Sequence, residues 1–122
     1  MEKYIDVMKK SLELSETILE GLEHVQKLLS EGNYEQSILL MEEVLVAYTT
    51  IERSIKPVNQ EFDNETIGHL QNGLKKTIEL VVNAYESKSY VKVNEIIQFS
   101  LLPQLNKFKH ELEQNFHTYI VS

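Results

Sequence analysis

The sequence predicts an all-α protein, an antiparallel four-helix bundle made of two tandem helical hairpins. Apolar residues recur at three- and four-residue spacing along four segments, which is the period of amphipathic helices. Short polar turns at residues 31–33 and 87–89 separate the members of each pair, so paired helices are expected to be antiparallel neighbours. The apolar pattern also repeats at an offset of about 56 residues, for example at Tyr34 and Tyr90. Any two amphipathic hairpins share such a pattern, so the repeat leaves open whether the chain arose by duplication.

The first hairpin is expected to occupy residues 2–56. Its first helix covers about residues 2–30, after which Gly32 supplies the left-handed conformation that commonly ends a helix. Asn33 is the expected N-cap of a second helix over 34–55. Pro57 lacks a backbone N–H and disfavours helix at the residue before it, so it is predicted to end the second helix. Residues 56–62 then form the predicted link between hairpins.

The second hairpin is expected to occupy residues 63–120. Asp63 or Asn64 caps a helix over 65–86, and Ser89 caps a last helix that begins at Tyr90 and ends near residue 119. Pro103 lies inside that last helix and predicts a kink near residues 99–103. The 122 residues together suit a single domain, residues 1–122.

Composition excludes several classes of function. The chain has no cysteine, so disulfides and thiolate metal sites are impossible. Its net charge of −7 repels phosphate backbones and anionic lipid, so neither nucleic acid nor membrane is an expected partner. No basic stretch precedes an apolar run near Met1, and no apolar run is long enough for a membrane span. A cytoplasmic protein of bacterial type is therefore expected.

The first helix has a wider apolar face than one bundle core requires. An inner seam includes Met8, Leu12, Leu19 and Leu22, and a second seam runs beside it. The two seams cover roughly half the circumference, whereas a core-facing stripe needs an arc of about 100° or more. The surplus predicts a homodimer face or a docking surface for a partner helix, unless this helix is central and touches several neighbours. The candidate interface residues are Tyr4, Val7, Leu14, Ile18, Gly21, Val25 and Leu28.

Glycines and histidines offer weaker signals. Gly21, Gly68 and Gly73 lie inside predicted helices, where each costs about 1 kcal/mol relative to alanine. Such a glycine either permits close approach of a neighbouring helix or forms a notch for a ligand. No histidine follows a glutamate by three residues, and no nucleophile elbow or glycine-rich phosphate loop is present. The sequence therefore predicts no metal, no cofactor and no enzymatic activity.

Three short segments resemble small, acidic, all-helical proteins of uncharacterised families from Gram-positive bacteria, which are domains of unknown function. The segments are Glu20-Gly21-Leu22, Leu29-Ser30-Glu31-Gly32-Asn33-Tyr34 and Ser100-Leu101-Leu102-Pro103-Gln104-Leu105. In size, charge and helicity the chain is also similar to flagellar export chaperones. That resemblance implies a small bundle that clamps the helical tail of a partner protein.

These observations lead to three functional hypotheses. The preferred one is a non-enzymatic protein-interaction module that self-associates through its first helix, as a possible homodimer. The alternative is a small chaperone or antagonist that masks a basic amphipathic helix of a partner, and the acidic ridge Glu13, Glu16, Glu20 and Glu23 would suit such a partner. A small-ligand sensor or enzyme would need an enclosed polar pocket, for which only a few inward polar residues are candidates.

Overall fold

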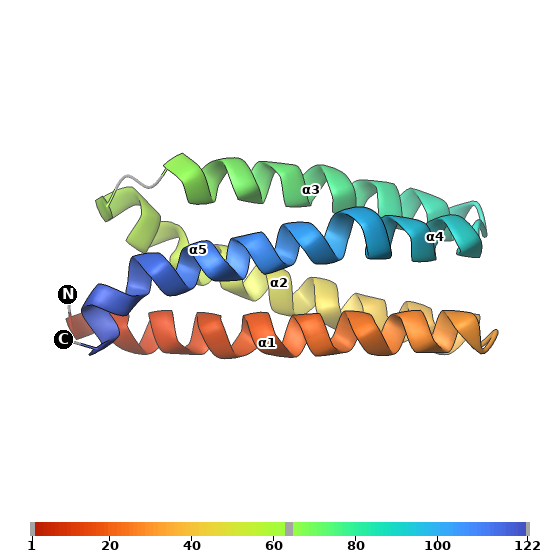
Figure 1. Ribbon diagram of the computed structural model, residues 1–122, viewed down its shortest axis with the longest axis horizontal. Helices are drawn as coiled ribbons and strands as arrows, with labels where there is room; N and C mark the ends of the chain where they lie inside the picture. Colours follow the sequence, from red (N-terminus) through yellow and green to blue (C-terminus); the bar gives the residue numbers. More distant parts are fainter. Residues whose placement is uncertain (1, 63–64, 122) are drawn as a thin grey trace.

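The computed structural model describes residues 2–62 and 65–121, with side chains over 4–60 and 65–117. It confirms an all-α, antiparallel four-helix bundle (Figure 1). The last arm is one long helix in three parts, because a π-helical segment interrupts it. The elements are α1 (Glu2–Ser30), α2 (Tyr34–Phe62), α3 (Glu65–Glu86), α4 (Tyr90–Ile96), the π-helix η1 (Ile97–Leu101) and α5 (Leu102–Val121).

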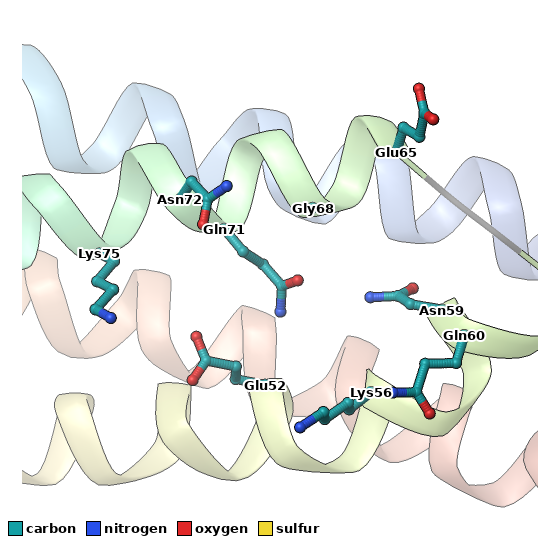
Figure 2. A pocket seen from close by; sticks show the side chains of 9 residues that line it. All are labelled: Glu52, Lys56, Asn59, Gln60, Glu65, Gly68, Gln71, Asn72 and Lys75. Carbon is teal, nitrogen blue, oxygen red and sulfur yellow. The ribbon is translucent and has the colours of Figure 1, made fainter.

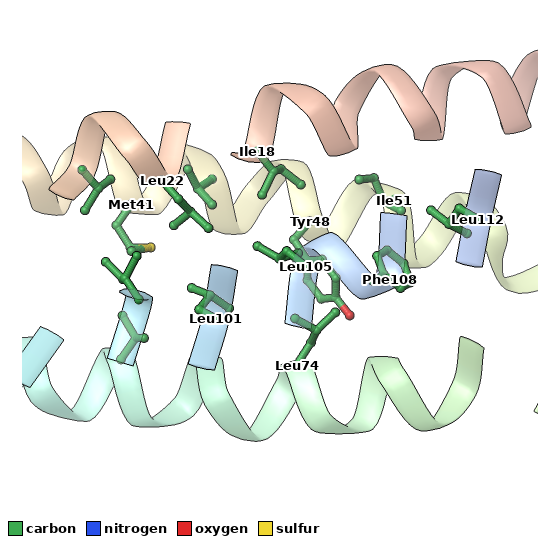
Figure 3. Packing of buried hydrophobic residues seen from close by; sticks show 14 of the residues in the cluster. Ile18, Leu22, Met41, Tyr48, Ile51, Leu74, Leu101, Leu105, Phe108 and Leu112 are labelled. Atoms are coloured by element: carbon green, nitrogen blue, oxygen red, sulfur yellow. The ribbon is translucent and has the colours of Figure 1, made fainter. Parts of the chain in front are cut away.

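The buried residues of α1 and α2 alternate at spacings of three and four. This is the spacing of helices that pack side by side around a common seam. The buried row of α1 takes its residues alternately from the inner seam and the second seam predicted from the sequence. Ser11 and Ile18 of the second seam are therefore buried, and Leu12 and Leu19 of the inner seam are only half-buried. Figure 3 shows how side chains from all four arms meet in this core. The seams are Met8, Ser11, Ser15, Ile18, Leu22, Val25 and Leu29 in α1, and Ser37, Met41, Val44, Tyr48, Ile51, Ile55 and Val58 in α2.

The two tight turns have the same backbone hydrogen bonds, 56 residues apart. From donor N–H to acceptor carbonyl, the first turn has Glu31–Lys27, Gly32–Leu29, Asn33–Leu28 and Ser37–Asn33, and the second has Ser87–Asn83, Lys88–Tyr85, Ser89–Ala84 and Val93–Ser89. Gly32 has the predicted positive φ, 78°, and Lys88 takes the equivalent position with φ 57°. Ser89 is the N-cap residue of α4, as predicted, but its side chain makes no capping hydrogen bond.

Tyr34 and Tyr90 stack face to face, with ring centroids 3.9 Å apart and planes 7° apart. They are equivalent positions of the two hairpins. When equivalent residues contact each other, the approximate two-fold axis that relates the halves passes between them. The repeat in the sequence therefore corresponds to a repeat in three dimensions.

The predicted end of the second helix at residue 55 is wrong, and so is the link over 56–62. Helix α2 continues through Pro57 to Phe62. The proline removes one N–H and crowds only the carbonyl four residues earlier, and its own side chain is exposed. Buried Ile55 and Val58 on either side hold the helix against the core. The expected caps at Asp63 and Asn64 lie outside the described residues.

Near Pro103 the structure has a π-helix, Ile97–Leu101, where the sequence predicts a kink. The Leu102 N–H donates to the Ile97 carbonyl, five residues back. Four buried residues of this arm are each four residues apart: Val93, Ile97, Leu101 and Leu105. An α-helical seam alternates spacings of three and four, so this stretch contains one residue more than an α-helix would need. Ile97 follows its counterpart Met41 by 56 residues, whereas Leu101 follows Val44 by 57. The π-helix is therefore a one-residue insertion that keeps the seam facing the core.

The two internal prolines should respond differently to substitution. Pro57→Ala restores a helical N–H and should raise the free energy of unfolding by about 1–3 kcal/mol. Pro103→Ala should gain less, because the preceding π-helix already accommodates the proline ring. Urea denaturation followed by circular dichroism measures both values. An equal or larger gain from Pro103→Ala would contradict this account.

Candidate interaction groove

The structure buries three of the seven predicted interface residues of α1 and leaves the other four half-buried. Ile18, Val25 and Leu28 are buried, with exposed fractions of 1%, 0% and 9%. Tyr4, Val7, Leu14 and Gly21 are half-buried. Helix α1 packs against α2, α4 and α5. The surplus apolar face is thus used by neighbouring helices, as the alternative reading of that face allowed.

Gly21 is required by this packing. A Cβ atom built there would lie 2.9 Å from Cγ2 of Val44, closer than real Cβ contacts allow. The glycine therefore lets α2 approach α1 closely. It is not a free notch for a ligand.

The open edge of the bundle lies between α2 and α3. Helix α1 packs closely against α2, whereas α2 and α3 share few contacts. Near the tight turns the edge is closed by the Tyr85 hydroxyl, which donates a 3.1 Å hydrogen bond to Ser37 Oγ. In Figure 1, α2 lies beside α1 near the turns and rises toward the start of α3 at the opposite end of the bundle.

A polar cleft of about 550 Å³ lies between α2 and α3, toward the end of the bundle away from the turns (Figure 2). Two lysines and two glutamates balance in charge, and four carboxamides contribute both donors and acceptors. Among the described residues, none of the four charged side chains forms an ion pair. The lining residues are Glu52, Lys56, Asn59 and Gln60 from α2, and Glu65, Gly68, Gln71, Asn72 and Lys75 from α3.

Toward the turns the same edge becomes apolar. Leu45 and Ile38 lie seven and fourteen residues before Glu52, on the same side of α2, and Ile78 lies seven residues after Gln71 on α3. These three side chains are half-buried. Leu39 and Val46 continue this apolar strip onto the outer face of α2, with exposed fractions of 63% and 66%.

The internal repeat makes the α1–α5 edge the counterpart of the α3–α2 edge. On the α1–α5 edge, Lys109 pairs with Glu16 and also lies 3.5 Å from Glu113, and the Glu16 interaction raises the pKa of Lys109. The counterparts of Glu16 and Lys109, at offsets of 56 and 57 residues, are Asn72 and Glu52. Both line the polar cleft and no described bond joins them. One edge is thus crosslinked and its counterpart is left open.

Tyr48 carries a buried hydroxyl one helical turn from the cleft residue Glu52. Its ring packs edge-to-face on Phe108, with centroids 6.0 Å apart, and the residue is 5% exposed (Figure 3). The hydroxyl makes no hydrogen bond of standard geometry among the described residues, although the Glu52 carboxylate lies near enough to interact with it. Burial, and then the negative charge of Glu52, raise the pKa of Tyr48 well above its usual value of about 10.

No metal centre or membrane span is found in the described part of the chain. There, no group of three or more histidine, aspartate or glutamate side chains could hold a metal ion. His110 and His117 share a face of α5 with Glu113 and Gln114. None of the helices, over the described residues, is long and apolar enough to cross a membrane.

The fold and the groove define a small, all-α, two-hairpin bundle with one open edge. The chain belongs to the family described as Domain of unknown function (DUF8042), whose match covers residues 6–111. The match extends from α1 into α5 and so includes both hairpins. No curated protein and no solved structure matches the chain.

Removing the Tyr48 hydroxyl should stabilise the protein. Tyr48→Phe eliminates a buried hydroxyl that makes no hydrogen bond of standard geometry, and it should raise the free energy of unfolding by about 1 kcal/mol at neutral pH. Above pH of about 10, the unfolded chain loses the Tyr48 proton and the folded protein keeps it, so the wild type loses stability as pH rises, by up to about 1.4 kcal/mol per pH unit. Denaturation at pH 7 and pH 11 measures both effects.

Tyr34→Phe, which removes an exposed hydroxyl, is the control. It should change the stability at neutral pH very little. A loss of stability in Tyr48→Phe would show that the hydroxyl has a partner in solution.

Proposed function

We propose that this protein is a non-enzymatic interaction module that holds a basic amphipathic helix of a partner protein along the α2–α3 edge. The observation that carries the proposal is the open edge itself, which has an apolar strip and few contacts between its two helices. The class of function is that of a small chaperone or antagonist, in line with the resemblance to flagellar export chaperones. A bacterial, cytoplasmic setting belongs to the same proposal.

The apolar strip supplies the anchoring surface. Leu39 and Val46 lie seven residues apart on one face of α2, about 10 Å along the helix. A partner helix with apolar residues at the same spacing can cover both side chains together with half-buried Leu45. Helix-in-groove recognition of this kind uses anchors one or two turns apart.

Charge favours a basic partner. Exposed Glu42 lies about four turns of α2 before the cleft residue Lys56, and exposed Glu79 and Glu86 follow the cleft residue Asn72 along the same side of α3. These carboxylates border the apolar strip, and the whole chain has a net charge of −7. Such a rim raises the association rate of a cationic helix and weakens as salt is added.

Self-association through α1 has less support. Three of its seven candidate interface residues are buried in the monomer's own core. The remaining four are half-buried against neighbouring helices of the same chain. We therefore place the binding surface on the opposite pair of helices.

A synthetic peptide tests the proposal directly. A fluorescent helix of about 18 leucine and lysine residues, about 27 Å long, should bind the full chain with an affinity that falls as salt rises. The double variant Leu39→Ser/Val46→Ser should weaken binding about tenfold or more, because two aliphatic anchors are lost. Fluorescence anisotropy measures the Kd, and light scattering establishes the mass of each species.

Phe99→Ser is the matched control. Phe99 is 76% exposed and lies on η1, which packs against α3, α4 and α5. Its substitution should leave peptide binding unchanged. Equal losses in the control and in the double variant, or no effect of the double variant, would falsify the proposal.

A further inference from the structure

Gly68 lies inside α3 at a place where the bundle does not require a glycine. A Cβ atom built there would meet no atom within 4 Å, whereas one at Gly21 would meet Val44 at 2.9 Å. Glycine is the least favourable helix residue after proline. Gly68 also lines the polar cleft and its missing side chain leaves a gap in the wall of that cleft. The position therefore suits close approach by something outside the chain.

The four carboxamides of the cleft are free to bind a ligand. Asn59 and Gln60 lie on α2, and Gln71 and Asn72 lie on α3; Asn59 and Gln71 project into the space between the two helices (Figure 2). None of them has a hydrogen bond to another group among the described residues. Each offers a carbonyl acceptor and an N–H donor, the same pair of groups that a peptide bond offers.

The charges of the cleft also point to a ligand without net charge. Lys56 and Lys75 are balanced by Glu52 and by Glu65, whose carboxylate points away from α2 in Figure 2, and none of them is ion-paired within the described part of the chain. The ammonium groups donate to carbonyls and the carboxylates accept from N–H groups. An extended main chain presents both kinds of group alternately, about 3.3 Å per residue. In the interior of a helix, the main-chain N–H and C=O groups already bond to each other and cannot bind the cleft.

We propose that the polar cleft binds an extended main-chain segment of a protein partner, with Gly68 as the point of closest approach. The inference rests on the proposed function, since the extended segment adjoins the partner helix that lies on the apolar strip. The partner motif is then a basic amphipathic helix followed or preceded by an uncharged, extended stretch. The helix provides the apolar contact, and the stretch provides main-chain hydrogen bonds.

The experiment compares three peptides on the full chain by fluorescence anisotropy. The first is the leucine–lysine helix, the second carries an added tail of about six serine and threonine residues at either end, and the third has the same tail with N-methylated amides. For the wild type, the tail should tighten binding about tenfold. N-methylation should remove that advantage, because it removes the main-chain donors.

Gly68→Ala and Gly73→Ala are matched variants. A Cβ at Gly73 would lie 3.8 Å from Nε2 of Gln104, an ordinary contact outside the polar-cleft wall. Both variants should raise the Tm by about 4 °C through helix propensity. Only Gly68→Ala should lose the tail's advantage, by about fivefold or more. A stabilised variant that binds less well cannot have failed through unfolding.

The outcomes separate the two proposals. If the helix binds and the tail adds nothing, or if the two alanine variants behave alike, the cleft does not bind main chain and the proposed function stands. If no helix binds, the proposed function fails, and the tail peptide alone is titrated at millimolar concentration. Shifts of the Asn59 and Gln71 side-chain amide resonances would then support the cleft as a main-chain site, and their absence would overturn it.

Discussion

A single buried seam, which must face the core along the whole of each helix, is the constraint on which the rest of the structure depends. In α1 this requirement buries Ser11 and Ile18 and leaves Leu12 and Leu19 half-buried. Ser11 is buried although its neighbour Leu12 is the more apolar residue. The same requirement keeps α2 helical through Pro57 and introduces one extra residue at η1. Local preferences are thus overridden where they conflict with the seam, and they hold in the turns, where nothing opposes them.

The sequence predicts much of this fold because its signals are long and periodic. Helices α1 and α3 begin and end where the apolar period and the turn residues place them, and Gly32 has the expected positive φ. The end of α2 is predicted wrongly because the helix-breaking effect of Pro57 is local. Burial of Ile55 and Val58, on either side of the proline, stabilises the helix enough to continue. The seam of α1 is ambiguous in the sequence because two adjacent apolar rows fit a helical period equally well.

The candidate site is harder to foresee, because it depends on what is absent. Gly21 and Gly68 look alike in the sequence, and only the distances to neighbouring atoms separate a packing requirement from a gap. The polar cleft gathers residues from two helices that do not stand out as a motif. A signal does exist in the repeat, where the Glu16–Lys109 pair of one edge corresponds to Asn72 and Glu52 of the other. When an ion pair is present in one half of an internal repeat and absent from the equivalent place in the other half, the half without it has the open edge.

The extra residue of η1 makes the two hairpins structurally non-interchangeable. Before it the halves match at an offset of 56, and after it at 57. An α1–α2 hairpin from a second copy, placed where α3–α5 lies, would lack that residue. Its seam would then rotate by about 100° relative to the core beyond the position of Ile97. The π-helix therefore discriminates against exchange of hairpins between copies, a hazard that accompanies every chain built from two similar halves.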